Sequence, residues 1–414
     1  MLIGVDASRA TAAARTGTEN YSLRLIRALL ELGTPHRFRL YTNRAASGEI
    51  FGPELAAGRA DLAYIPFPRL WTHLRLSWEM IRARPDVLFV PAHVLPLRHP
   101  RASVATVHDL GYLAYPEAHR AQDRAYLDWS TRWNARHAAA VVADSQATRR
   151  DLIDAYAAEP DRVRVVYLGR DESLRPVHDP ARLAAARARY GIRGPYFLYV
   201  GTLQPRKNLA RLVAAFARLL ARCDAPGADR PTAPEASGGQ DGRAWPETAC
   251  ATTDLQLVLA GRRGWLFDEL SGEVGRLELA SRVVFPGYVD EADLPALYGG
   301  SLALVYPSLY EGFGMPVLEA QSCGVPVMTS NNSSLPEIAG DSALLVDPHD
   351  VDAIAAAMYR LLTDEGLRKE LIRRGFANVQ RFAWEKCARE TLAVLEEVAA
   401  SAQRGSARGG GHGA

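Results

Sequence analysis

The segment YEGFGMPVLEAQSCGVPV, residues 310–327, carries the succession of signals that decides the fold of this chain. An apolar run, LALVYP (302–307), precedes it and is typical of a buried strand. Pro316 suits the first position of a helix, because proline has no amide hydrogen to lose there. Gly324 then favours the end of that helix. The segment therefore predicts a strand, a glycine-containing turn and a short helix in direct succession.

The turn and the two glutamates of this segment predict a ligand site. Gly312 and Gly314 let the backbone come close to a ligand, and the free amides of a first helical turn bind anions. We expect Glu311 in the loop at the mouth of a cleft and Glu319 one turn into the helix. Carboxylates accept hydrogen bonds from sugar hydroxyls. One glutamate would then bind a hexose and the other a ribose, with phosphates between them. The simpler alternative is a packed helix with two solvated glutamates.

A second segment, GTLQPRKNL (201–209), follows the apolar run YFLYV (196–200) and precedes a helical pattern. Arg206 and Lys207 are therefore expected at the carboxyl end of a strand, beside a helix start capped by Asn208. Only three of the 49 basic residues are lysines, which favours a specific role for Lys207. Two fixed cations there would offset the charge that builds on a departing diphosphate. A surface pair of cations on a loop is the alternative.

Short apolar runs alternate with helical patterns along both halves of the chain. This alternation predicts parallel sheets covered by helices on both faces. Open parallel sheets bind ligands beyond the carboxyl ends of their strands. The sequence therefore predicts an α/β fold with two doubly wound, Rossmann-like domains that face each other across a cleft. The runs expected as strands are LIGV (2–5), FRLY (38–41), DVLFV (86–90), SVATV (103–107), AAVVA (139–143), RVRVVYL (162–168), YFLYV (196–200), LQLVLA (255–260), RVVFPG (282–287), LALVYP (302–307), VPVMTS (325–330) and ALLV (343–346).

Breaks in this pattern predict the domain boundaries. Gly, Pro and charged residues concentrate between the two halves, which indicates a linker. The Gly-, Pro- and Ala-rich stretch at 222–254 and the tail have no periodicity and predict disorder. The expected parts are an amino-terminal domain at 1–175, a nucleotide-sugar domain at 190–380 with its disordered insertion, a helix at 381–400 that crosses back to the first domain, and a disordered tail at 401–414.

The composition excludes several classes of protein and site. The formal net charge is only +2, so no strong field predicts nucleic acid as a partner. The first residues read directly into a strand rather than a secretory signal, and no window is apolar enough for a membrane span, so we expect a cytoplasmic protein. The four cysteines have no metal or disulfide spacing. Asp350 and Asp352 form the only DxD, at a predicted helix start, where capping explains them better than a metal.

The first half of the chain adds three candidate residues. Gly17 precedes a long predicted helix, so its backbone could approach a phosphate. His108 follows the run SVATV, which places it at the carboxyl end of a strand with Asp109 beside it. A histidine in that position could bind or deprotonate a hydroxyl, although a structural role is about equally expected.

The segment RLWTHLRLSWEMIRAR (69–84) has an amphipathic pattern among arginines. Its apolar stripe could dock on a membrane surface near a lipid-linked acceptor. A helix that covers its own sheet is the preferred reading, by roughly two to one, because such stripes usually face a core. The stripe consists of Trp71, Leu74, Trp78 and Ile81.

Taken in order, these elements resemble the retaining glycosyltransferases of family 4, which have the GT-B fold. The stretch SLYEGFGMPVLEAQSCGVPVMTSNNSSLPEIAG is similar to the E-x7-E region of that family, and GTLQPRKNL is similar to its diphosphate clamp. The resemblance implies that Glu311 contacts the donor sugar, that Glu319 binds the ribose and that His108 lies at the sugar. The other positions it implies are Phe313, Gly314 and Met315 for backbone binding of sugar and phosphate, Arg206 and Lys207 for the clamp, Gly17 for the loop glycine, and Tyr288 and Val289 for the border of the base.

The chain departs from the family pattern in two places. Many members have an arginine directly after the strand glycine, where this chain has Thr202, so Arg206 would take the role of that arginine. The amino-terminal loop lacks the usual paired glycines, which leaves the role of Gly17 open.

The resemblance also implies a mechanism. Family members transfer a hexose with retention at the anomeric carbon, without a carboxylate nucleophile and without a metal or other cofactor. The leaving phosphate takes the proton of the incoming hydroxyl as an ion pair forms and collapses. The cations at 206 and 207 would then do most of the electrostatic work.

The stretches TVHDLGYLAYPEAH and FVPAHVLPL resemble the mannosyltransferase-like branch that builds bacterial surface polysaccharides. This resemblance makes GDP-mannose the preferred donor and a glycan or lipid-linked molecule the expected acceptor, with peripheral contact to the inner face of the membrane left open. His93 and Asp109 are acceptor-side candidates, and a structural role for His93 is at least as strongly expected. Two alternatives stay open, namely a catalytically silent sugar-nucleotide-binding subunit and an enzyme like the 2-epimerase of UDP-N-acetylglucosamine.

Overall fold

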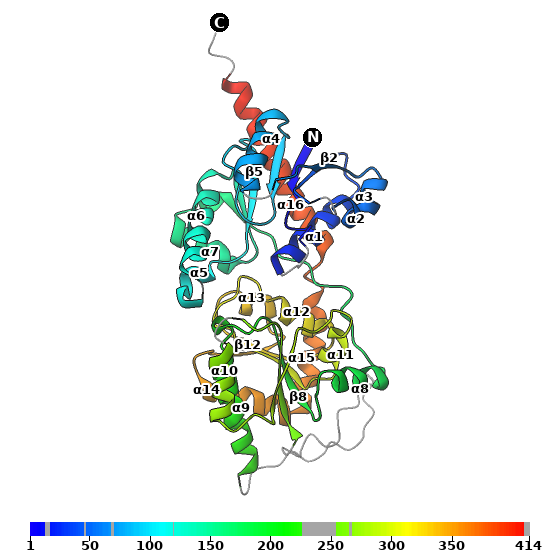
Figure 1. Ribbon diagram of the computed structural model, residues 1–414, viewed down its shortest axis with the longest axis vertical. Helices are drawn as coiled ribbons and strands as arrows, with labels where there is room; N and C mark the ends of the chain where they lie inside the picture. The colour runs from blue at the N-terminus through cyan, green and yellow to red at the C-terminus, as the bar shows by residue number, and fades with distance from the viewer. Residues whose placement is uncertain are drawn as a thin grey trace. The chain divides into compact units, whose positions relative to one another are not determined.

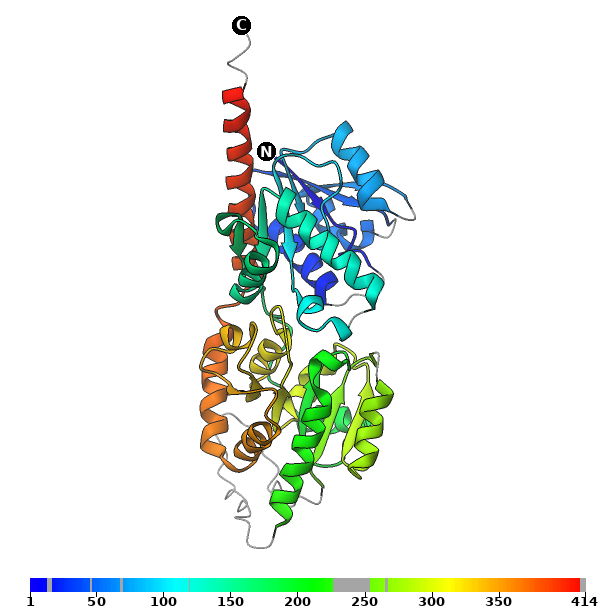
Figure 2. The same cartoon turned by 90° about the vertical axis from the view of Figure 1, so that its left-hand side faces the viewer.

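The computed structural model describes residues 1–12, 17–44, 47–67, 70–118, 120–225, 254–264 and 267–409. The chain divides into two compact units, which Figures 1 and 2 show in colours that run from blue to red along the sequence. Unit 1 comprises Met1–Gly169 and Phe382–Ala414, and unit 2 comprises Arg170–Arg381. Most of the expected insertion, residues 226–253, lies outside the described residues.

The described part of unit 1 contains a seven-stranded sheet in the order β3-β2-β1-β4-β5-β6-β7. All of its strand pairs are parallel, with Val5 in register with Leu40 on one side and Phe89 on the other. Continuous burial of β4, β5 and β6 follows from helices on both faces of the sheet. The strands are β1 (Leu2–Asp6), β2 (Arg37–Thr42), β3 (Ala60–Tyr64), β4 (Val87–Val90), β5 (Ser103–Val107), β6 (Ala140–Ala143) and β7 (Val163–Val165).

Helices cover both faces of this sheet. Helix α16 (Trp384–Gly409) packs against α1 (Gly17–Glu31) and contacts β4, β5 and β6, although it follows unit 2 in the sequence (Figure 2). The remaining helical elements of unit 1 are α2 (Ser47–Ile50), α3 (Gly52–Ala56), η1 (Trp71–Leu76), α4 (Ser77–Arg82), α5 (Gly111–Ala114), η2 (Pro116–Ala118), α6 (Ala121–His137), α7 (Gln146–Tyr156) and η3 (Pro160–Arg162).

The described part of unit 2 contains a six-stranded parallel sheet in the order β10-β9-β8-β11-β12-β13. Figure 1 shows α9, α10 and α14 on one face and α8, α11 and α15 on the other. The strands are β8 (Tyr196–Val200), β9 (Gln256–Ala260), β10 (Val283–Gly287), β11 (Ala303–Tyr306), β12 (Val327–Ser330) and β13 (Leu344–Val346). The helices are α8 (Pro180–Arg189), η4 (Pro205–Lys207), α9 (Leu209–Asp224), α10 (Phe267–Arg276), α11 (Leu294–Gly299), α12 (Met315–Ser322), α13 (Leu335–Ala339), α14 (Val351–Thr363) and α15 (Glu365–Val379).

The twelve runs that the sequence predicts as strands all contain a strand, within a few residues of the expected bounds. Strand β3 is the one that the pattern missed in the described chain. Its sequence, ADLAY, is short and only partly buried, because it lies at the edge of the sheet beside β2. Helix α16 continues beyond Ala400, where we expected the tail to begin, as far as Gly409.

Both sheets have the Rossmann strand order, with a switch point where the order reverses. In unit 2 the switch lies between β8 and β11, which pair directly through Phe197 with Ala303 and Leu198 with Leu304. Loops that leave these two strands at their carboxyl ends must therefore lie next to each other, although about a hundred residues separate them.

Candidate functional site

A buried charge cluster lies at the switch point of unit 2. The Lys207 Nζ donates to Glu311 Oε1 at 2.5 Å and to the hydroxyl of Tyr306 at 3.0 Å, and that hydroxyl donates to the same Glu311 oxygen at 2.8 Å. The Arg206 guanidinium donates to Glu311 Oε2 at 3.3 Å and to the carbonyl of Tyr310. Lys207 and Glu311 are both 7% exposed. The cluster therefore brings both predicted cations onto one predicted glutamate.

The strand order explains why these residues meet. Arg206 and Lys207 form the short helix η4 after β8, while Glu311 lies in the loop after β11. The backbone amide of Leu309 donates to the carbonyl of Arg206 at 2.9 Å, which ties the two loops together. Asn208 adds a second link, since its side-chain amide donates to the carbonyl of Pro307 at 3.0 Å.

The predicted helix cap at Asn208 is wrong. Asn208 precedes helix α9 in a left-handed conformation, with φ of 62°, and makes no side-chain capping bond to that helix. Its amide instead bonds the carbonyls of Pro307 and Pro348. Ser334 precedes α13 and also makes no side-chain cap, because its hydroxyl donates to the carbonyls of Glu311 and Phe313 at 2.9 and 2.7 Å. Both side chains thus hold the site loop rather than a helix end. By contrast, Asp350 caps α14 as predicted, accepting from two amides of the first turn.

The cluster controls the charge of Glu311. Burial alone would disfavour a carboxylate, but Lys207 and Arg206 beside it outweigh burial and lower the pKa of Glu311 to about 2. The carboxylate is therefore ionised at neutral pH. Two cations and one anion leave a net positive charge at the carboxyl end of β8 and β11. This arrangement excludes the reading of Glu311 as a solvated surface residue.

The turn between Glu311 and helix α12 has the backbone that its glycines predict. Gly314 has φ of 109°, and an added Cβ would approach the Leu335 side chain to 2.8 Å. Phe313 is buried, and Met315 opens α12 with Pro316 in its first turn. The helix ends before Gly324, which has φ of 68°. Only glycine suits both positions, because side chains rarely adopt a φ in that range.

Glu319 lies one turn into α12 and is partly buried. The hydroxyl of Tyr298, on α11, donates to Glu319 Oε2 at 2.8 Å. The two glutamates of the segment therefore have different partners: Glu311 is bound to cations, whereas Glu319 accepts from a tyrosine. The sequence pattern named neither Tyr298 nor Tyr306, since a tyrosine in an apolar strand or helix gives no signal of its partner.

Tyr288 and Val289 follow β10 at its carboxyl end. Val289 is buried, while Tyr288 is exposed and lies 5.0 Å from the guanidinium of Arg262. Arg262 follows β9, the neighbour of β10 in the sheet. An exposed ring beside a cation offers a flat surface on which a nucleotide base could stack.

A second polar cluster lies in unit 1 at the carboxyl ends of β4, β5 and β6. His108, which follows β5, contacts Asp144 Oδ2 through Nδ1 at 2.7 Å and the carbonyl of Pro91 through Nε2 at 3.1 Å. Asp144 and Pro91 follow the two neighbouring strands. The Tyr21 ring packs edge-on against the imidazole, with centroids 4.7 Å apart. The sequence pattern missed Asp144, because nothing local marks it as the partner of a residue on another strand.

The neighbours of His108 determine its protonation. The Pro91 carbonyl only accepts, so Nε2 donates to it, while Nδ1 shares a proton with Asp144, whose own pKa is raised by burial against the lowering effect of His108. Burial opposes the imidazolium, but Asp144, with Asp109 and the Pro91 carbonyl, outweighs burial and raises the pKa of His108. An imidazolium in this position favours donating a hydrogen bond over deprotonating a hydroxyl, the two roles that the sequence left open.

Replacing Asp144 by asparagine should lower the pKa of His108, because only Asp109 and the Pro91 carbonyl then oppose the effect of burial. In the native protein the raised pKa stabilises the fold below the unfolded-state pKa, and this stabilisation is lost as pH rises through the folded-state pKa. Asp144→Asn should remove that dependence. NMR titration of the His108 imidazole measures its pKa, and Asp61→Asn, on the exposed edge strand β3, is the control. An unchanged His108 titration in Asp144→Asn would contradict the assignment.

The remaining candidates of unit 1 have distinct surroundings. His93 has φ of 79°, and its Nε2 is a buried atom with no hydrogen-bond partner among the described residues. Burial, with Arg9 and His108 nearby, lowers the pKa of His93 to about 4, so it is neutral at physiological pH. Asp109 accepts from the amide of Gly111 at 2.9 Å, as a turn residue does. Gly17 is the first residue of α1, and an added Cβ there would meet nothing within 4 Å.

The amphipathic segment of unit 1 forms η1 and α4. Trp71 is buried and its indole donates to the carbonyl of Ile65 at 2.9 Å. Leu74, Trp78 and Ile81 are 53%, 59% and 62% exposed, so the preferred reading of the whole stripe as core is wrong for three of its four residues. None of the helices in the described chain has the length and apolar character needed to cross a bilayer.

Comparisons with known proteins agree with this geometry. The family model described as Glycosyl transferases group 1 matches residues 185–377, and the model described as Glycosyltransferase Family 4 matches residues 15–174. The O-antigen chain mannosyltransferase B of Escherichia coli is 32% identical over 391 residues, which are 91% of this chain and 95% of that protein. The D-inositol 3-phosphate glycosyltransferase of Acidothermus cellulolyticus is 33% identical over 63% of this chain and 53% of that protein.

Solved structures show the same fold. The crystal structure of Anabaena Alr3699/HepE in complex with UDP and glucose has a TM-score of 0.67 and 18% identity, over 96% of this chain and 99% of that chain. WaaG, a glycosyltransferase involved in lipopolysaccharide biosynthesis, has a TM-score of 0.63 and 15% identity, over 96% and 98%. These likenesses confirm the predicted pair of Rossmann-like domains of the GT-B fold.

Proposed function

This chain belongs to the family 4 glycosyltransferases, and from that membership we propose that it transfers mannose from GDP-mannose, with retention, to a glycan or lipid-linked acceptor in cell-surface polysaccharide biosynthesis. The observation that carries the proposal is the buried cluster of Arg206, Lys207 and Glu311 at the switch point of unit 2. Mannose is the preferred sugar because the mannosyltransferase of Escherichia coli matches nearly the whole length of both chains.

The cluster is suited to the departure of a diphosphate. As the bond from the anomeric carbon to the diphosphate oxygen breaks, negative charge builds on the leaving group. Arg206 and Lys207 stabilise that charge, and Glu311 holds both cations in place while it accepts from a sugar hydroxyl. The leaving diphosphate takes the proton of the acceptor hydroxyl, whose oxygen bonds to the same face of the sugar. Fixed cations supply the positive charge, so the proposed reaction needs no metal ion or other cofactor.

The other candidate residues complete the proposed site. Glu319, held by Tyr298, accepts from the ribose, and the amides of Phe313, Gly314 and Met315 bind sugar and phosphate. Tyr288 and Val289 border the base, and Gly17, the first residue of α1, lies near a phosphate. In unit 1, His108 exchanges its bond to the Pro91 carbonyl for one to a sugar hydroxyl, while His93 and Asp109 serve the acceptor.

A panel of donors tests the sugar nucleotide. GDP-mannose should raise the unfolding temperature more than UDP-, dTDP- and ADP-sugars at equal concentration, because a ligand that binds only the native state stabilises it by mass action. At one hundred times its dissociation constant, the expected stabilisation is about 2.7 kcal/mol. Thermal-shift measurements rank the donors by the rise in unfolding temperature that each gives, and transfer assays with the same donors test that ranking. A larger shift with any other nucleotide sugar would overturn the choice of donor.

We also propose a cytoplasmic enzyme that contacts the inner face of the membrane through the exposed residues Leu74, Trp78 and Ile81. Arg75 and Arg82 flank this stripe and both pair with Glu79, which leaves one net positive charge, and arginine side chains favour anionic lipid surfaces. Such contact would bring the enzyme to a lipid-linked acceptor.

The double variant Trp78→Ser/Ile81→Ser should lose most binding to vesicles that contain phosphatidylglycerol, because it removes the apolar surface that inserts. Flotation with the purified protein measures it. Leu345→Ser, at an exposed apolar residue of unit 2, is the matched control and should bind like the native protein. Absence of binding by the native chain would remove the membrane from the proposal.

A further inference from the structure

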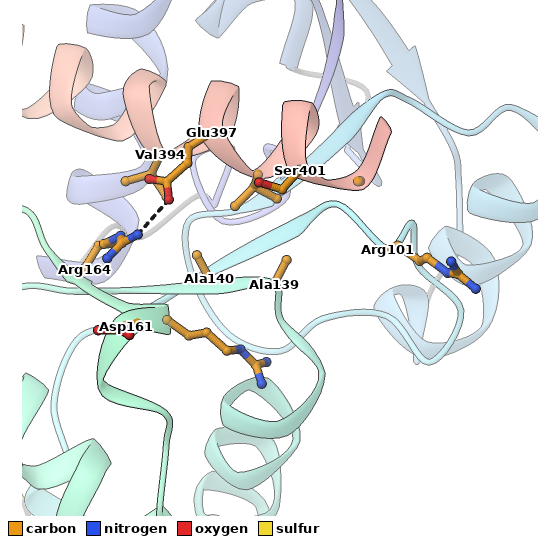
Figure 3. A pocket seen from close by; sticks show the side chains of 11 residues that line it. Arg101, Ala139, Ala140, Asp161, Arg164, Val394, Glu397 and Ser401 are labelled. Carbon is orange, nitrogen blue, oxygen red and sulfur yellow. Dashed lines mark hydrogen bonds and ion pairs between the residues drawn. The ribbon is translucent and has the colours of Figure 1, made fainter. Parts of the chain in front are cut away.

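Unit 1 contains a cavity of about 370 Å³ beneath the second half of helix α16 (Figure 3). Its opposite wall is formed by the starts of β6 and β7, and Arg101 lies just before β5. His108 and Asp144 follow the other ends of β5 and β6. The cavity therefore lies at the opposite edge of the sheet from the candidate residues of the transfer reaction.

The lining of this cavity contains more arginines than acidic residues. Three arginines, Arg101, Arg162 and Arg164, and two acidic residues, Asp161 and Glu397, line it, and Arg162 also pairs with Glu159 at 3.4 Å. Arginine is the side chain best suited to bind phosphate, because its planar fork offers five N–H donors. An anion is therefore the kind of ligand that these arginines can hold.

The three arginines differ in the hydrogen bonds and ion pairs that they make with the protein. Arg162 donates to the carbonyls of Arg136 and Ala138 at the end of α6, which is a structural role. Arg164 makes an ion pair with Glu397 at 2.7 Å, the dashed line in Figure 3. Arg101 is exposed and has no ion pair among the described residues. Figure 3 shows the Arg101 guanidinium directed away from Ser401 and Glu397, so Arg164 is the arginine that can bind a ligand beside them.

Helix α16 contributes further polar groups on the side of Glu397. Ser401 lies one turn later on the same face, and its hydroxyl accepts from the Arg404 guanidinium at 3.1 Å. That hydroxyl keeps its own proton for a ligand oxygen. The rest of the wall is small and apolar, made of alanines and of Val394 and Val398. A ligand that fits has a charged head beside a compact, uncharged body.

We propose that this cavity binds a phosphate ester about the size of a sugar phosphate, with its phosphoryl group on Arg164 and Ser401 in place of Glu397. The volume lies at the lower end of the range of small-molecule sites, which is about 300–1,000 Å³. Because Arg164 pairs with Glu397, the ligand must displace that carboxylate. The site is independent of donor transfer, and the phosphoryl group can come from a free sugar phosphate or from a lipid head group.

The test uses the full chain with methyl-labelled valines, observed by NMR during titration with inorganic phosphate and with a hexose 6-phosphate at constant ionic strength. Val394 and Val398 on the cavity wall report this site and not the phosphate-binding cluster of unit 2. Both resonances should shift in a saturable way. Arg164→Gln should weaken binding about tenfold, since it removes a charged donor. Arg98→Gln, at an exposed arginine outside the cavity, should change nothing.

Glu397→Gln gives the opposite expectation. It removes the competing carboxylate and should strengthen phosphate binding several-fold, whereas a purely structural ion pair would give no gain. Binding to phosphatidic acid vesicles that is lost in Arg164→Gln would identify the lipid as the source, and a response to the hexose phosphate alone would identify the free metabolite. No shift of either valine, or weaker binding in Glu397→Gln, would overturn the proposal.

Discussion

Replacing Lys207 by methionine should lower the rate of sugar transfer by about 10²–10³-fold, the effect of removing one preorganised charged donor from a transition state. Lys207 is buried and contacts Glu311 and Tyr306, so no other side chain of the cluster can take its place. The same change leaves the Glu311 carboxylate with Arg206 as its remaining cation. We therefore also expect the free energy of unfolding to fall by about 3–5 kcal/mol, as for a broken buried ion pair.

Initial rates with the activated sugar and denaturant unfolding measure the two effects separately. Lys369→Met is the matched control, because Lys369 is in the same unit and pairs with Glu365 at 2.7 Å on the exposed surface of α15. Loss of that exposed pair should lower the free energy of unfolding by no more than about 1 kcal/mol and should leave the rate of transfer unchanged. Full activity of a folded Lys207→Met protein would end the assignment of this cluster to the leaving diphosphate.

Replacing Glu311 by glutamine should produce a loss of activity of similar size and change the response of the fold to acid. The glutamine keeps the shape of the side chain but leaves Arg206 and Lys207 without their anion. In the native protein the pKa of Glu311 is lowered to about 2. Its stabilising contribution is therefore present above the unfolded-state pKa and is lost as pH falls from about 4.5 toward 2.

Between pH 7 and pH 3, the free energy of unfolding should fall less steeply for Glu311→Gln than for the native chain. Glu365→Gln, from an exposed pair, should leave the pH dependence of the free energy of unfolding almost unchanged. The double variant Lys207→Met/Glu311→Gln should lose less stability than the sum of the two single variants, because each single change already breaks the same Lys207–Glu311 contact, yet it should not regain transfer. A double variant that is as unstable as the sum of the two single variants would contradict the coupling.

Local sequence signals predicted the elements of this fold well. Strands such as YFLYV and SVATV are continuous apolar runs, because a parallel sheet buries both of their faces. Strand β3 was not predicted, because an edge strand is only half buried and its residues, ADLAY, contain no such apolar run. Turn chemistry was equally readable at Gly314 and Gly324, where the backbone needs a φ that other residues rarely adopt.

Partners of polar side chains were much harder to predict. Asn208 and Ser334 have the composition of helix caps, but each donates to carbonyls of a neighbouring loop instead. Trp78 and Ile81 have the spacing of a core-facing stripe, yet their helix lies with that stripe exposed. In each case the local pattern fits two environments equally well, and packing against another element chooses between them.

The amino-acid sequence by itself determined the order of strands and helices, the two α/β domains and which residues stand at the carboxyl ends of the strands, since periodicity and turn signals act over a few neighbouring residues. Only the tertiary structure decided that Glu311 binds Lys207 across 104 residues and that His108 binds Asp144 across 36. These pairs exist because β8 lies beside β11 and β5 beside β6. Their charges depend on burial and on partners from other strands, and neither is encoded in any local stretch of the chain.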